Sequence, residues 1–188
     1  ERKLEKFEDV YQDLCQIKQL SRPDPQTGEL INRLQQVSLF RRDTEVFNWI
    51  LDHPWVTEDA SHPVNYQFSY QSRRFKNILL SFILPDQSRG FLWLLLHNQA
   101  LSVPYLFSES EGLYPHMARR VLHYLIRHQC AYTTIRHAAL AEHLVSFRSL
   151  FLHIRDMPQR FFAHEEIAKE IARDREIQDG DGDVVFTG

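Results

Sequence analysis

The sequence contains little cysteine, no long apolar run and no excess of basic residues. Its two cysteines, Cys15 and Cys130, lie far apart without the spacing of metal ligands, so we expect a reducing, cytoplasmic setting. The net charge of −3 argues against a nucleic-acid partner, because such a partner prefers a basic face. The longest apolar run, residues 91–96, is far shorter than the roughly 18–20 residues that span a bilayer.

The chain has enough apolar residues for one folded domain. It has 188 residues, of which 43% are hydrophobic and 12% aromatic, and residues 1–188 are expected to form a single domain. It begins with Glu1 and not with Met, which suggests a piece of a longer protein. Residues 1–28 are expected to form an N-terminal helix, over residues 4–20, and a proline-containing connector.

The spacing of apolar residues predicts an α/β (α+β) fold with a mostly antiparallel sheet of about six to seven strands, flanked by helices. Helices are expected after an N-cap at Asp43 and over residues 4–20, 113–129, 138–145 and 165–174. Strands are expected over residues 66–70, 77–84, 91–96, 99–107, 132–135, 150–154, 159–163 and 184–186. Residues 30–40 fit either a strand or a helix. Short loops make the region 66–107 an antiparallel meander.

The loop over residues 107–112 joins an apolar strand to the strongest predicted helix. Free backbone N–H groups and the helix dipole favour an anion at such a place. Two carboxylates, Glu109 and Glu111, would repel it. Removing either one should tighten phosphate binding by about 0.3–1 kcal/mol.

This order of elements resembles the Gcn5-related N-acetyltransferase (GNAT) fold over roughly residues 37–163. In that family a meander leads through a pyrophosphate-binding loop, Gln/Arg-x-x-Gly-x-Gly/Ala, into the central helix. The matching residues here, 108–113, are Ser-Glu-Ser-Glu-Gly-Leu, so the motif is degenerate. The resemblance implies a bacterial acyltransferase domain that moves an acyl group from acyl-CoA to an amine acceptor.

The resemblance also implies site residues. The pantetheine arm would pair with the backbone of Leu101, Val103 and Tyr105, where Pro104 would help the strands to separate. The pyrophosphate would meet the amides of Ser110, Glu111 and Gly112. The family's tyrosine acid has no match between residues 138 and 151, so Tyr132 is the nearest substitute, and His97 is the candidate base.

Two other function classes fit the same sequence. One is a non-catalytic module that keeps the fold and binds a protein partner along a sheet edge. The other is a structural half-domain that packs against a missing N-terminal domain.

Several clusters have a structural and a functional interpretation. The pairs His123/His128 and His137/His143 lack the helical spacing of metal ligands, and residues 179–183 fit a turn better than a calcium loop, so no metal site is assigned. Aromatic residues near a short helix predict core packing, with a substrate groove as the alternative; they are Trp49, Trp55 and Tyr66. Two arginine pairs are expected on the solvated surface, although either pair could reach a ligand phosphate: Arg41-Arg42 and Arg73-Arg74.

Overall fold

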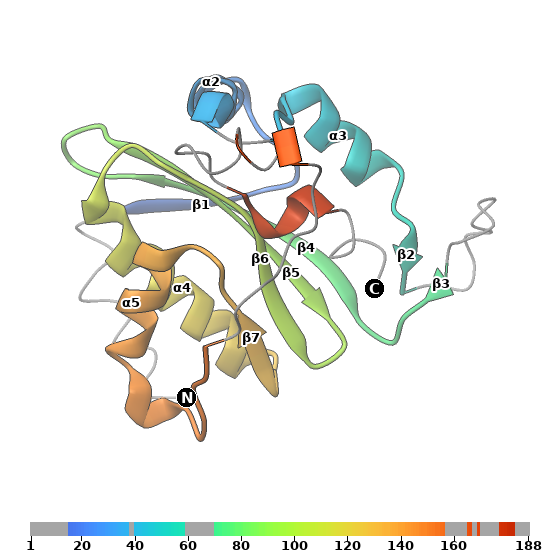
Figure 1. The fold of residues 1–188 in the computed structure, drawn as a ribbon, viewed down its shortest axis with the longest axis vertical. Coiled ribbons are helices and arrows are strands. Elements are labelled where there is room, and N and C mark those ends of the chain that lie inside the picture. Colours follow the sequence, from blue (N-terminus) through green and yellow to red (C-terminus); the bar gives the residue numbers. More distant parts are fainter. Residues whose placement is uncertain are drawn as a thin grey trace.

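The computed structural model describes residues 15–37, 40–58, 70–156, 165–166, 169 and 177–182. Within them the chain forms an α+β fold with a five-stranded, mostly antiparallel mixed sheet of order β1-β4-β5-β6-β7 (Figure 1). The sheet strands are β1 (Gln16–Leu20), β4 (Phe75–Ile83), β5 (Arg89–His97), β6 (Ala100–Ser108) and β7 (Tyr132–Thr134). The helices are α2 (Pro25–Leu34), α3 (Thr44–Asp52), α4 (Tyr114–Arg127) and α5 (Ala138–Val145).

Shorter elements complete the described chain. The strands β2 (Val56–Thr57) and β3 (Tyr70–Gln71) form a separate parallel pair. The 3-10 helices are η1 (Gln35–Val37), η2 (Glu111–Leu113), η3 (Arg148–Leu150) and η4 (Asp179–Gly182).

The predicted meander is confirmed for β4, β5 and β6, which pair as consecutive antiparallel strands. Each hairpin turns through one non-glycine residue with a positive φ angle, Gln87 at 68° and Asn98 at 52°. Of the side chains expected in the core, those of Phe82, Phe91, Trp93 and Leu95 are buried. Leu84 is only half-buried, because it lies after the end of β4 in the first hairpin turn.

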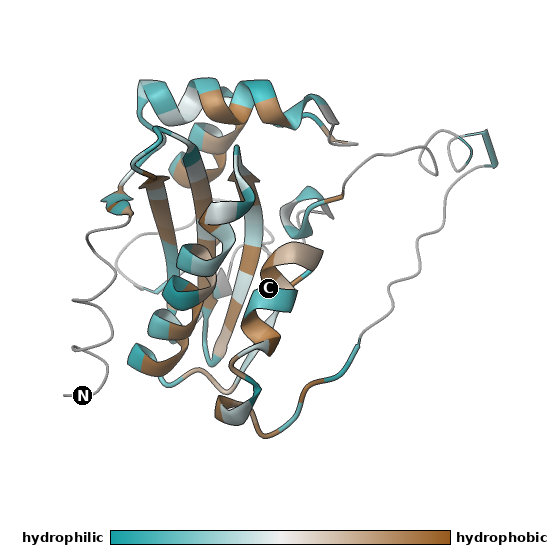
Figure 2. Ribbon diagram, turned by 90° about the vertical axis from the view of Figure 1, so that its left-hand side faces the viewer, coloured by the Kyte–Doolittle hydropathy of each residue, from teal (hydrophilic) through white to brown (hydrophobic). Residues whose placement is uncertain are grey.

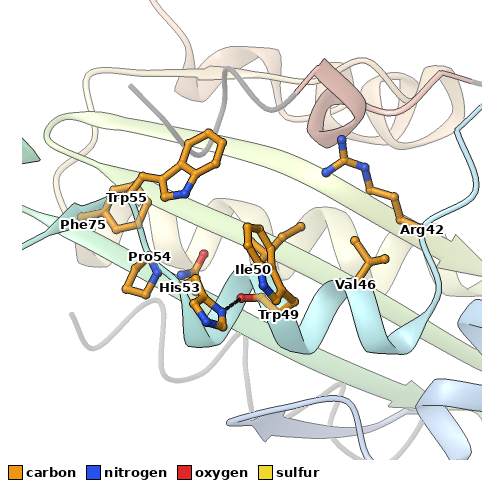
Figure 3. Close-up of a pocket in the computed structure, with 9 residues that line it drawn as sticks. Arg42, Val46, Trp49, Ile50, His53, Pro54, Trp55 and Phe75 are labelled. Atoms are coloured by element: carbon orange, nitrogen blue, oxygen red, sulfur yellow. Dashed lines mark hydrogen bonds between the residues drawn. The ribbon is translucent and has the colours of Figure 1, made fainter. Parts of the chain in front are cut away.

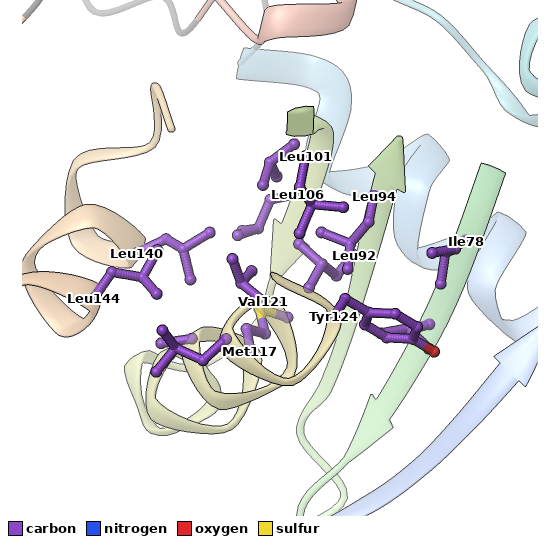
Figure 4. Packing of buried hydrophobic residues seen from close by; sticks show 14 of the residues in the cluster. Ile78, Leu92, Leu94, Leu101, Leu106, Met117, Val121, Tyr124, Leu140 and Leu144 are labelled. Atoms are coloured by element: carbon purple, nitrogen blue, oxygen red, sulfur yellow. The ribbon is translucent and has the colours of Figure 1, made fainter. Parts of the chain in front are cut away.

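Helices cover both faces of the sheet (Figures 1 and 2), and the described residues form a hydrophobic core on each face. On one face α4 and α5 cover residues such as Leu92, Leu94 and Leu106, as Figure 4 shows. On the other face α2 and α3 cover Trp93 and Tyr105, among others. The side chains of β5 are buried on both faces, which explains why its sequence is an unbroken apolar run.

Local capping determines where α2 and α3 begin. The side chain of Asp24 accepts a hydrogen bond from Thr27 N at 2.9 Å, and Pro25 occupies the first turn, where it loses no helical bond. As expected, Asp43 caps α3 through a 3.0 Å hydrogen bond from Val46 N. The ambiguous residues 30–40 begin as helix, because α2 and η1 continue to Val37.

The structure corrects two predicted elements. The helix expected over residues 4–20 is wrong at its end, because Gln16–Leu20 forms β1 beside β4. Ile17 and Leu20 are three residues apart and would share one face of a helix. In the strand they point to opposite faces of the sheet, Ile17 to the core under α4 and Leu20 to the core under α3. The strand expected over 150–154 is wrong as well, since η3 occupies its start and the side chain of Leu152 is fully exposed.

The number of strands also differs from the prediction. The described sheet has five strands, where about six to seven were expected. The strands predicted over 159–163 and 184–186, and most of the helix predicted over 165–174, lie outside the described residues.

Phe47 on α3 is the side chain on which the second core depends most. It is fully buried, and its ring contacts those of Phe91, Trp93, Tyr105 and Phe107 at centroid distances of 4.5–6.3 Å. We expect Phe47→Ala to lower the free energy of unfolding by roughly 3–5 kcal/mol, measured by urea denaturation. Trp49→Ala on the same helix is the matched control, and its effect should stay below about 1 kcal/mol because Trp49 is 52% exposed. Equal losses for the two variants would contradict this packing.

Candidate functional site

The strands β6 and β7 run parallel and then separate. β7 pairs only with the first residues of β6, Ala100 to Ser102. On the other side of β6, Trp93 pairs with Tyr105 and Leu95 with Ser102, so β6 has one more residue than β5 between these pairs. Pro104 lies in this bulge and has no N–H group to donate. Beyond the bulge the outer edge of β6 is therefore not paired with β7.

The bulge changes the direction of the side chains along β6. Val103 and Leu106, which would face opposite sides of a regular strand, both belong to the core under α4. Tyr105 and Phe107 belong to the core under α3. The side chains of Leu101, Val103 and Tyr105, the three residues expected to meet a pantetheine arm, are all buried. Leu101 is paired with β7, whereas Val103 and Tyr105 lie beyond this pairing.

A cavity of 380 Å³ lies where β6 and β7 separate. It lies beside the N-terminal ends of η2, α4 and α5, and a C-terminal segment forms one wall. The lining residues are Val103, Leu106, Glu111, Tyr114, Arg136, His137, Ala138, Ala139, Ile177, Gln178 and Asp179. Backbone N–H groups at helix N-termini favour an anion, and Arg136 adds a positive charge.

The loop before α4 satisfies its amides internally. Ser110 Oγ accepts a hydrogen bond from Gly112 N at 3.2 Å, and Ser110 O accepts one from Leu113 N at 3.1 Å. Ser108 Oγ donates to Ser110 O at 2.7 Å and lies 3.4 Å from Ser110 N. The amides of Ser110 and Gly112, which were expected to meet a pyrophosphate, thus already have partners within the loop.

The two loop carboxylates have different roles. Glu109 accepts a hydrogen bond from Arg89 N at 2.6 Å and forms an ion pair with Arg33 of α2. Its own N–H donates to Arg89 O, so it extends the ladder between β5 and β6. Glu111 is exposed and lines the cavity. Of the two, Glu111 is therefore the one placed to repel a phosphate in this cavity.

Sequence reasoning missed the charged pair at the cavity wall. Arg136 forms an ion pair with the largely buried Asp179. Burial raises the pKa of the Asp179 carboxyl, and the attraction of Arg136 offsets only part of this effect. No sequence spacing links these residues, which come together only because the C-terminal segment folds back onto β6.

His97 and Tyr132 lie at the opposite end of β6 from the loop. Both are at the level of Ala100, His97 on β5 and Tyr132 on β7. His97 is half-buried, and burial lowers the pKa of its imidazole, so the neutral form predominates at pH 7. Tyr132 is 63% exposed. The structure brings these two residues to one end of the sheet but not to the loop.

A second cavity, of 320 Å³, lies between α3 and β4 (Figure 3). Its lining residues are Arg42, Val46, Trp49, Ile50, His53, Pro54, Trp55, Phe75 and Asn77. Trp49 stacks on His53 at a centroid distance of 4.9 Å and is half-exposed, so the expected core packing is wrong for this residue. Phe75 packs edge-on against His97 at 5.7 Å, which brings that imidazole next to the wall of the cavity. Tyr66 lies outside the described residues.

The two arginine pairs also contribute internal contacts. Arg42 Nη2 donates to Asp181 O at 2.9 Å, and Arg74 Nη1 donates to His128 O at 2.9 Å. Both side chains are half-buried, whereas Arg41 and Arg73 are exposed as expected. Arg42 therefore joins the second cavity to the segment that forms a wall of the first.

Comparison with protein-family models, curated proteins and solved structures finds no match to this chain. Among the described residues, no helix is long and apolar enough to cross a membrane. The same part of the chain brings together no group of three or more histidine, cysteine or acidic side chains that could hold a metal ion.

Removing Glu109 should lower the free energy of unfolding more than removing Glu111. Glu109→Ala removes the acceptor of Arg89 N and the ion pair with Arg33, so we expect a loss of roughly 1–2 kcal/mol in the free energy of unfolding. Glu111→Ala is the matched control and should stay within about 0.5 kcal/mol of the unmodified protein. Urea denaturation of both variants tests this. A larger loss for Glu111→Ala than for Glu109→Ala would contradict the assignment.

Proposed function

We propose that this chain is an acyl-CoA-dependent N-acyltransferase with a degenerate phosphate loop. The observation that carries the proposal is the separation of β6 from β7, which opens a backbone edge beside a cavity. The order of elements supports it, because a meander leads through a loop into α4 and then into a parallel strand and α5. This order resembles that of the Gcn5-related N-acetyltransferases.

The amides of the pantetheine arm would pair with the edge of β6 beyond its bulge. Leu101 O already accepts a hydrogen bond from Thr133 Oγ1 at 2.7 Å, and Leu101 pairs with β7. We therefore place the arm along Val103 to Phe107, where β7 no longer covers the strand. The phosphates would lie toward Ser110–Gly112 and the first turn of α5, where Arg136 supplies a positive charge.

In the proposed reaction, the acceptor amine attacks the thioester carbonyl carbon. A C–N bond forms, the C–S bond breaks, and the thiolate leaves. His97 would accept the proton that the amine loses, and its lowered pKa keeps it neutral and able to do so. Tyr132 would supply the proton to the thiolate. An amine held in the second cavity would lie near His97, because Phe75 lines that cavity and its ring contacts the imidazole of His97.

One observation favours the alternative of a non-catalytic interaction module. The loop amides that would hold a pyrophosphate are bonded within the loop, and Glu111 adds a negative charge at the same place. A protein that keeps the fold without the ligand would show this arrangement. Binding of acyl-CoA separates the two functions.

Calorimetric titration with acetyl-CoA and with longer acyl-CoA tests the proposal. The Kd should rise about tenfold or more in Ala138→Trp, because the indole would fill the cavity that Ala138 lines. Ala131→Trp, at an exposed position before β7, is the matched control and should bind as the unmodified protein does. Glu111→Ala should bind tighter by about 0.3–1 kcal/mol.

Turnover is measured as thiol release from the same thioesters with a panel of amines. A rate above the uncatalysed background that falls in His97→Gln would support the acyltransferase. Absence of acyl-CoA binding to the unmodified protein and to Glu111→Ala would favour the interaction module.

A further inference from the structure

A short C-terminal segment, Ile177–Gly182, fills part of the opening between β6 and β7. Its η4 turn packs on β6 (Figure 1). The side chain of Gln178 accepts a hydrogen bond from the edge of this strand. Within the segment, Gln178 N donates to Asp181 Oδ2 at 2.8 Å and Asp181 N donates to Gln178 O at 3.1 Å. The segment is thus a closed turn that presents two consecutive side chains, Gln178 and Asp179, to the cavity.

Gln178 uses the part of the edge that the bulge leaves open. Leu106 N donates a 2.7 Å hydrogen bond to Gln178 Oε1. This acceptor is the carbonyl oxygen of a carboxamide, the same chemical group that a pantetheine arm carries. The segment therefore places an amide carbonyl on an N–H group that lies within the proposed binding edge.

Asp179 neutralises the cation of the same cavity. Its carboxylate forms the ion pair with Arg136, and its side chain is only 8% exposed. Arg136 is then engaged by an anion from the protein's own chain. Together Gln178 and Asp179 supply an amide carbonyl and a negative charge, the two features that an acyl-CoA would offer to Leu106 N and Arg136.

Two further contacts hold the segment in place. A Cβ atom added at Gly180 would lie 2.4 Å from the ring of Tyr105, so only glycine allows this close approach. Arg42 Nη2 donates to Asp181 O at 2.9 Å from the second cavity. The segment thus contacts β6, Arg136 just before α5, and Arg42 just before α3.

We propose that the segment Ile177–Gly182 is an intramolecular competitor that occupies the acyl-CoA site and must move before the ligand binds. This inference rests on the proposed function and assigns a regulation to the same site. The apparent affinity for acyl-CoA is then reduced by the fraction of molecules in which the segment is in place. Any change that loosens the segment should strengthen ligand binding.

The test compares Gln178→Ala and Gly180→Ala with the control Gln26→Ala, an exposed glutamine on α2. Two quantities are measured on the full chain: hydrogen exchange at the Leu106 amide and the Kd for acetyl-CoA. In both segment variants we expect faster exchange at Leu106 and about 2- to 10-fold tighter binding, from loss of a hydrogen bond or from the clash with Tyr105. Saturating acetyl-CoA should restore protection of Leu106 in the variants, and the control should match the unmodified protein.

The outcomes separate this inference from the proposed function. Unchanged affinity in both variants, with faster exchange at Leu106, would overturn the competition and leave the acyl-CoA site standing. Binding without protection of Leu106 would overturn it as well. No binding of acetyl-CoA to the unmodified protein or to either variant would overturn the proposed function, and the competitor with it. Tighter binding in the variants than in the unmodified protein supports both.

Discussion

The rest of the site depends on one backbone constraint, the extra residue in β6 at Val103 and Pro104. A regular parallel strand beside β6 would satisfy its edge along the whole length. Here β7 pairs as far as Ser102 and then the pairing ends, at a point where Pro104 could not have donated to it. The bulge also directs both Val103 and Leu106 into the core under α4, while Tyr105 and Phe107 pack in the core under α3, so both faces of the sheet hold this part of β6 in place. The opening therefore follows from the backbone geometry of β6.

The opening between β6 and β7 determines which groups of the surrounding elements pair with one another. Buried peptide groups need partners, and an edge that is not covered by a strand must find them elsewhere. For Leu106 N the partner is Gln178, and for the nearby Arg136 it is Asp179. In the acidic loop, Glu109 binds Arg33 of α2 and the backbone N–H of Arg89 of β5. Serine residues of the loop accept hydrogen bonds from its backbone amides. The opening is thus partly filled by the protein's own chain, at the place where we propose that an extended, amide-containing anion binds.

The sequence predicts the parts of this fold that local physics determines. Asp43 is recognisable as a cap, and the apolar residues of β5 indicate a buried strand, because capping and burial follow from a few adjacent residues. The helix predicted over residues 4–20 is wrong over Gln16–Leu20, because the spacing of Ile17 from the preceding apolar residues fits a helix, whereas long-range pairing with β4 makes this segment a strand. Trp49 was expected in the core, but its position on α3 points it to a cavity. The approach of Gln178 to Leu106 links residues 72 apart in the chain, which no local pattern can show.

The central claim is that the open edge of β6 is the ligand site, and an NMR titration of the isotopically labelled protein with coenzyme A tests it most directly. The account predicts amide shifts that saturate together at Val103 and over residues 105–107, at residues 110–113, at the first turn of α5 and over residues 178–182. Amides of α3 around Trp49 should shift little, because the second cavity is proposed for the acceptor. Shifts confined to α3, or no shifts at millimolar coenzyme A, would contradict the account.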